Sequence, residues 1–249
     1  MVYWIFIPIT VSVVSFIGSW AVYGLALSYG HVCSLSNWQY RNSCEPNMSE
    51  LCCTDSRVPT ISTSGKGIPE NSLFTATISA GSFLFLVFCV FHHAHILNKC
   101  STQAVLSRLA LGFGCVASIG AFVAGNCNPG YLVLLHYLGA AVSFICICFY
   151  CLLLTMLTGN CLLTGKEKVL YPVRALSTAL QVLVTLFYCI FFAQEPYLLK
   201  HLSAVFEWIL SMNLELFELS FVFEFYVFSS SMLSSLINTE EEEKSLIMS

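Results

Sequence analysis

Charge is scarce in this chain of 249 residues, of which 10% are charged and 57% are hydrophobic. Soluble domains carry about 25% charged residues, so a soluble globular fold is excluded. The ten basic residues form no cluster that could neutralise a phosphate backbone, which excludes nucleic-acid binding. The composition therefore indicates a membrane protein that contacts lipids.

The sequence also lacks the motifs of the common enzyme classes. It contains no phosphate-binding loop, nucleophile elbow or zincin helix. His92 and His95 share one face of an apolar stretch, but no cysteine or carboxylate motif nearby completes a metal site. We therefore expect histidines that face lipid headgroups, and a non-enzymatic protein without catalytic residues, metal or cofactor.

Long apolar runs dominate the chain, and a membrane helix needs about 20 such residues. The first run lacks the basic segment that precedes the core of a signal peptide, so we expect it to remain as a span. The pattern predicts an all-α membrane protein with a six-helix transmembrane bundle. Its membrane domain covers 1–228, with spans at about 4–28, 73–97, 105–125, 131–158, 173–193 and 202–228, a loop at 29–72, and an acidic tail at 229–249.

Basic residues predict the orientation of the bundle. If both termini are cytosolic, the loops after the second and fourth spans face the cytosol. These loops and the adjoining helix ends carry five basic residues, whereas the short loops on the other side carry only Lys200. We therefore expect the 29–72 loop to be external.

The external loop contains features of an oxidising compartment. Cys33, Cys44, Cys52 and Cys53 can form two disulfides in three possible pairings. Asn47 begins an Asn-Met-Ser glycosylation sequon. The other nine cysteines lie in or beside apolar runs and are expected to pack as small hydrophobic residues.

Four glutamates occur in the predicted sixth span, where a carboxylate at membrane depth costs about 2.5–3.5 kcal/mol. At 100° per residue, Glu207, Glu215 and Glu218 fall within about 80° of one another, whereas Glu224 projects elsewhere. One face of this helix is therefore not expected to meet lipid. We expect these four residues and His136 to form a buried polar cluster, with His136 within reach of Glu207 as a polar clamp between helices.

Small residues gather in the third and fourth spans. In a bilayer such residues allow helix backbones to approach closely. We therefore predict tight packing of these two helices through a set that includes Gly112, Gly114, Gly120, Gly125 and Gly139.

The tail carries an acidic run followed by a hydrophobic pair. Glu242 stands four residues before Leu246-Ile247, which is the form of an acidic dileucine signal read by sorting adaptors. A solvated acidic tail is the alternative interpretation.

Several short motifs follow one another in a characteristic order. They are His31-Val32-Cys33, Asn37-Trp38-Gln39-Tyr40, Ser43-Cys44, Cys52-Cys53, Val58-Pro59-Thr60-Ile61-Ser62, Gly125-Asn126, His136-Tyr137-Leu138-Gly139-Ala140, Glu207-Trp208 and Phe223-Glu224-Phe225. Their order resembles that of the damage-regulated autophagy modulator family, and most closely of its transmembrane protein 150 branch, over about 4–228. Cys127-Asn128 departs from the family, which tends to have Phe-Gln there.

The resemblance implies a regulator of autophagy or stress survival and of phosphoinositide signalling. Its partners would be lipid-kinase or autophagy-machinery proteins, and its location the plasma membrane and the endosomal or lysosomal membrane. The sixth-span glutamates leave open a mechanosensitive channel component or a lipid or ion transporter. A lipid-modifying enzyme is a third alternative, which the missing catalytic motifs argue against.

Overall fold

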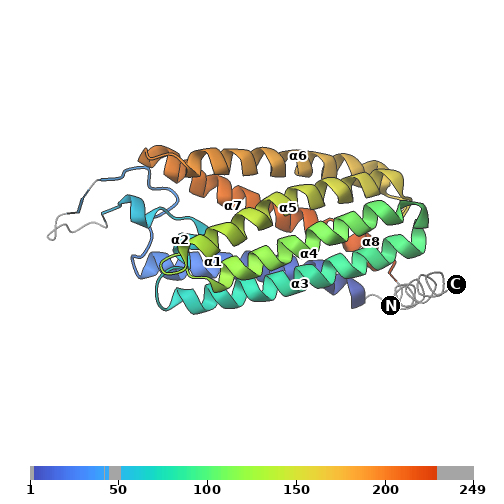
Figure 1. The fold of residues 1–249 in the computed structure, drawn as a ribbon, viewed down its shortest axis with the longest axis horizontal. Coiled ribbons are helices and arrows are strands. Elements are labelled where there is room, and N and C mark those ends of the chain that lie inside the picture. Colours follow the sequence, from blue (N-terminus) through green and yellow to red (C-terminus); the bar gives the residue numbers. More distant parts are fainter. Residues whose placement is uncertain (1–2, 42, 45–51, 229–249) are drawn as a thin grey trace.

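The computed structural model describes residues 3–41, 43–44 and 52–228. Long α-helices lie side by side in an elongated bundle (Figure 1). The elements in chain order are η1 (Tyr3–Ile5), α1 (Phe6–Ser28), η2 (Asp55–Arg57), α2 (Ile61–Ser64), α3 (Glu70–Lys99), η3 (Ser101–Gln103), α4 (Ala104–Asn126), α5 (Val133–Asn160), α6 (Glu167–Phe192), α7 (Tyr197–Leu219) and α8 (Val222–Tyr226).

The long helices form a closed ring. Each packs against its neighbour in the chain, from α1 through α3, α4, α5 and α6 to α7, and α7 returns to pack against α1. From α3 to α7 short connections enforce this order, because helices joined by a few residues become antiparallel neighbours. The ring therefore has an interior that its members share.

The two ends of the bundle differ. At one, here called the loop end, α2 and the other described residues between α1 and α3 lie at the ends of the helices (Figure 1). At the other, here called the far end, α8 packs against η1, and the turns between α3 and α4 and between α5 and α6 lie there too.

Five helices are long and apolar enough to cross a membrane: α1 with η1, α3, α4 with η3, α5 and α6. Large apolar side chains such as Val105, Leu176 and Leu216 are exposed on the outer surface, as expected of helices that face lipid. The expected all-α fold is thus confirmed for the described residues, and the long apolar helices support a membrane protein. α7 lies alongside these helices (Figure 1) but carries one lysine and three glutamates, so the sixth span and the orientation remain predictions.

The predicted helix at 202–228 differs from the structure at both ends. α7 begins earlier, at Tyr197 after Pro196, and it ends at Leu219. A separate short helix, α8, follows. The break has a physical cause, because the Ser220 carbonyl accepts a hydrogen bond from the Arg174 side chain, 2.9 Å away.

Three disulfides occur among the described residues. Cys33 pairs with Cys53 and Cys44 with Cys52, which selects one of the three possible pairings in the loop. The third joins Cys100 to Cys161 at the far end, so the expectation that these two act as small hydrophobic residues is wrong. The turns after α3 and α5 meet there, and sequence spacing alone does not reveal this contact.

Helices α4 and α5 approach each other closely at two glycines. A methyl group on Gly120 would lie 2.7 Å from the Gly139 carbonyl oxygen and 2.9 Å from the Ser143 nitrogen. A methyl group on Gly139 would in turn meet the Gly120 carbonyl oxygen at 2.7 Å. This pair therefore sets the distance between the two helices.

Candidate functional site: a carboxylate-lined cavity between two polar ends

At the loop end, two adjacent residues of α7 fasten the segment before α2. The Glu207 carboxylate accepts a hydrogen bond from the Ile61 backbone N–H at 3.2 Å, and Trp208 Nε1 donates to the Pro59 carbonyl at 3.0 Å. Both side chains are buried. Residues 59–61 are thus held against α7 by Glu207 and Trp208.

His136 lies near these contacts, but its hydrogen-bond partners are Ala124, Cys127 and Ser62 and do not include Glu207. Its Nδ1 donates to the Ala124 and Cys127 carbonyls at 2.8 and 3.0 Å, since carbonyl oxygens only accept. Its Nε2 contacts the Ser62 hydroxyl at 3.0 Å, and Ser62 also interacts with the Glu207 carboxylate. The predicted pair is therefore bridged by Ser62.

His201 anchors the first part of the loop to α7. Its Nε2 lies 3.0 Å from the Leu35 carbonyl and must donate, so in the neutral ring Nδ1 accepts from the Tyr40 hydroxyl at 2.6 Å. Burial raises the pKa of Tyr40 to about 12, which keeps that hydroxyl protonated and able to donate. Sequence reasoning did not single out this contact.

A cavity of about 180 Å³ runs through the interior of the ring below the loop end. The three glutamates of α7, Glu207, Glu215 and Glu218, line this cavity, whereas Glu224 of α8 does not. The remaining walls are mainly apolar and come from α1, α2, α3, α4, α5 and α7. They include Val11, Ile61, Phe74, Ile78, Phe85, Ala117, Ala121, Ala140, Phe144, Ile147, Leu210 and Leu214.

Only one of the two carboxylate oxygens of Glu215 has a hydrogen-bond partner. Its Oε1 accepts from the Ser211 hydroxyl at 3.3 Å, and the Ser12 hydroxyl of α1 donates to its backbone carbonyl at 2.9 Å. Its Oε2 has no hydrogen-bond partner, and water cannot easily replace one because the residue is buried, with 7% of its surface exposed. A buried acceptor without a partner costs about 1–3 kcal/mol, so this oxygen marks a place where a donor would be stabilising.

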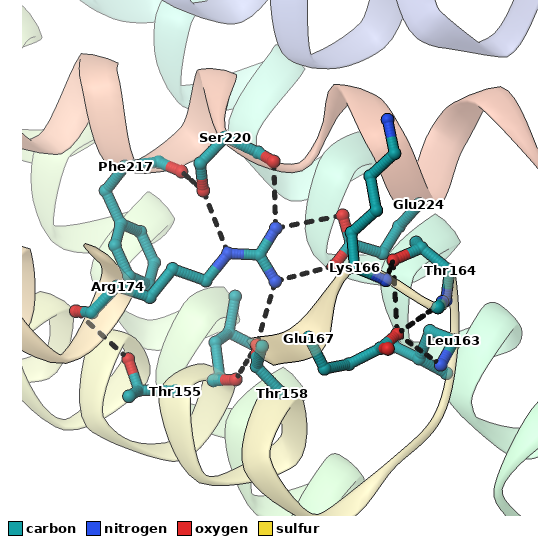
Figure 2. A network of polar contacts seen from close by, with 12 residues as sticks. Thr155, Thr158, Leu163, Thr164, Lys166, Glu167, Arg174, Phe217, Ser220 and Glu224 are labelled. Carbon is teal, nitrogen blue, oxygen red and sulfur yellow. Dashed lines mark hydrogen bonds and ion pairs between the residues drawn. The ribbon is translucent and has the colours of Figure 1, made fainter. Parts of the chain in front are cut away.

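Glu224 forms part of a separate network at the far end, so the predicted cluster is divided in two. Arg174 of α6 and Glu224 of α8 make a two-pronged ion pair, with distances of 2.6 Å from Nη1 to Oε1 and 2.9 Å from Nη2 to Oε2 (Figure 2). Both side chains are buried, at 0% and 2% exposure.

The remaining donors of Arg174 are also used. Nη1 donates to the Thr158 hydroxyl at 2.8 Å, while Nε and Nη2 donate to the Ser220 hydroxyl and carbonyl, each at 2.9 Å (Figure 2). The guanidinium lies 3.5 Å from the centre of the Phe221 ring. All five N–H groups thus have partners, which is what a buried charge needs to be tolerated. The sequence analysis identified Arg174 only as a basic residue near the predicted cytosolic side.

The Glu167 carboxylate completes this end by closing the turn before α6. It accepts from the backbone N–H groups of Leu163 and Thr164 at 2.7 and 2.6 Å (Figure 2). The nearby Lys166 ammonium lies 4.2 Å from the centre of the Phe223 ring of α8. The α5–α6 turn is therefore closed by Glu167 and contacts α8 through Lys166.

The histidines of α3 are buried inside the protein, which corrects the expectation that they face lipid headgroups. His92, His93 and His95 are all buried. His92 packs edge-on against Phe221 with ring centres 5.0 Å apart, and His93 Nδ1 contacts the Ser107 hydroxyl at 2.7 Å. Across the described part of the chain, no group of three or more His, Cys, Asp or Glu side chains could hold a metal ion.

The predicted glycosylation and sorting residues, Asn47, Glu242, Leu246 and Ile247, lie outside the described residues.

Comparison with known proteins assigns this chain to a family. Residues 3–228, which contain both polar ends and the cavity, match the family described as Frag1/DRAM/Sfk1/Cwh43P N-terminal domain. The chain belongs to this family. The resemblance to the damage-regulated autophagy modulators is thereby confirmed, and the match reaches across all of the bundle.

Curated relatives of this Frag1/DRAM-family chain divide into two groups. Transmembrane protein 150A of Homo sapiens is 31% identical over 242 residues, covering 94% of this chain and 88% of the relative, and that of Xenopus laevis is 30% identical over 227 residues, covering 89% and 83%. Modulator of macroautophagy TMEM150B-A of Xenopus laevis is 25% identical over 224 residues, covering 90% and 86%. No solved structure matches. With the apolar helices, these relatives identify a multi-pass membrane protein.

Proposed function

We propose that this chain is a non-enzymatic regulator of autophagy or stress survival that acts through partner proteins. The observation that carries the proposal is the family match over 3–228, because the family includes proteins named as modulators of macroautophagy. We extend the proposal to phosphoinositide signalling, with lipid-kinase or autophagy-machinery proteins as partners, and to the plasma membrane and the endosomal or lysosomal membrane as its location.

Loss of the protein is expected to lower autophagic flux during starvation, because a positive regulator would then be missing. Flux is measured as turnover of a lipidated autophagosome marker with and without a lysosomal inhibitor. Re-expression of the wild-type chain should restore it, and a chain carrying Lys168→Met, a change at an exposed position, should do so equally. Unchanged flux in starved cells that lack the protein would contradict the autophagy role.

We also propose six spans with both termini cytosolic, α7 being the sixth. The loop disulfides Cys33–Cys53 and Cys44–Cys52 then lie outside the cell, whereas Cys100 and Cys161 lie at the cytosolic end. Glutathione keeps cytosolic thiols reduced, so the Cys100–Cys161 bond of the structure is expected to be reduced to two thiols in unstressed cells.

Thiol counting tests this orientation. Cells are lysed in denaturant with an alkylating reagent, and modified cysteines are identified by mass spectrometry before and after reduction. Of the thirteen cysteines, only the four in the loop pairs should require reduction, which leaves nine modified at once. If Cys100 and Cys161 alone were protected while the loop cysteines reacted, the orientation would be the reverse.

A further inference from the structure

The central cavity has the features of a binding site for a small organic cation. We propose that it binds a primary amine with a compact apolar body, whose ammonium group lies between Glu215 and Glu218. Both residues line the cavity, and they stand three positions apart on α7, which places them on one face of the helix. This inference concerns a ligand and does not depend on the proposed role in autophagy.

The charge of the ligand follows from the cavity walls. Glu215 Oε2 is buried without a hydrogen-bond partner, while Glu218 is 3% exposed and lies close enough to interact electrostatically with Glu215. No lysine or arginine is among the described residues that line the cavity, and all donors of Arg174 are used at the far end. An ammonium group brings three N–H donors and one positive charge, which suit two neighbouring carboxylates.

A metal ion fits this cavity less well than an amine. The described residues hold no cluster of three or more potential ligands, whereas Ca²⁺ takes about six to eight oxygen ligands. Much of the wall is instead apolar, with aromatic rings from Phe74, Phe85 and Phe144. Such walls favour a ligand with a hydrophobic body and only one polar end.

The volume of the cavity limits the size of the apolar part of the ligand. About 180 Å³ is somewhat more than the roughly 150 Å³ of an apolar cavity in another protein that accepts benzene. A single aromatic ring with a short aminoalkyl arm fits this limit. A complete two-chain lipid does not.

The test compares two probes of nearly equal shape on the purified full-length protein in detergent. 2-Phenylethylamine carries the ammonium group, whereas 2-phenylethanol carries a neutral hydroxyl. Binding is measured as the rise in unfolding temperature over a concentration series of each probe. The variants are Glu215→Gln with Glu218→Gln to remove the charge, Ala117→Leu to fill the cavity at a fully buried wall position, and Glu195→Gln as an exposed control outside the cavity.

The wild-type protein and Glu195→Gln should bind the amine at least about tenfold more tightly than the alcohol, which corresponds to about 1.4 kcal/mol. The double glutamine variant should lose this preference and keep the alcohol response. Ala117→Leu should respond to neither probe. The proposal is overturned if the wild-type protein fails to prefer the amine, or if the preference persists in the Ala117→Leu variant. The comparison of probes on the wild type and on Ala117→Leu decides the matter even if the double variant does not fold.

Discussion

Replacing Arg174 with methionine is expected to lower the free energy of unfolding by about 3–5 kcal/mol, the largest effect that we predict for one side chain. The reason is the buried carboxylate that the substitution leaves behind. Glu224 is 2% exposed, and both of its oxygens are held by Arg174. Without the guanidinium, the Ser220 carbonyl also loses the donor that stabilises the break between α7 and α8.

The measurement is an equilibrium unfolding titration with dodecyl sulfate in mixed micelles, followed by tryptophan fluorescence. The double variant Arg174→Met with Glu224→Leu should be more stable than Arg174→Met alone, because it leaves no buried charge without a partner. Some loss should remain, about 1–3 kcal/mol, since the Ser220 carbonyl is still left without its donor.

Lys168→Met provides the matched control, because Lys168 is an exposed basic residue in the same helix. It should change the free energy of unfolding by no more than about 0.5 kcal/mol. If Arg174→Met behaved like this control, or if the double variant were the least stable of the three, the network would not stabilise the far end as argued.

Replacing Gly120 with alanine is expected to lower the free energy of unfolding by about 1–3 kcal/mol. A single methyl group at this position would lie 2.7 Å from the Gly139 carbonyl oxygen and 2.9 Å from the Ser143 nitrogen. Both are backbone atoms of α5, so no side chain can rotate to make room. The helices would have to separate and lose contacts along their length.

Gly112 on the same helix is the control for this substitution. A methyl group there would meet no other atom within 4 Å. Alanine favours a helix over glycine by about 0.8–1.0 kcal/mol, so Gly112→Ala should be neutral or stabilising in the same unfolding titration. Equal effects of the two substitutions would show that the close approach of α4 and α5 does not limit stability.

The identity and the rough extent of the helices could be predicted from local patterns. Long apolar runs predict membrane helices because the bilayer leaves no water for the backbone groups. The same local geometry predicts that Glu207, Glu215 and Glu218 share a face, since the direction of a helical side chain depends only on its position along the helix. The structure places these three on one cavity, with Glu224 apart from them.

The partners of these residues could not be predicted in the same way. Arg174 and Glu224 are 50 positions apart, and Cys100 and Cys161 are 61 apart. Such pairs depend on which helices become neighbours and how far each is shifted along its axis, and no local pattern encodes either quantity. The burial of Arg174 was not predictable for this reason, because a basic residue at the end of an apolar run is usually an interfacial charge.

The sequence by itself determined the class of this protein: a helical membrane bundle of the Frag1/DRAM family with a cysteine-bearing loop and carboxylates on one face of a late helix. Only the tertiary structure decided that the helices close into a ring, that Ser62 stands between His136 and Glu207, and that Glu215 is left with a buried oxygen without a partner. The physical reason is the separation along the chain over which each effect acts. Hydrophobicity and helix periodicity act between residues close in the chain, whereas a cavity exists only where several distant segments fail to fill the space between them.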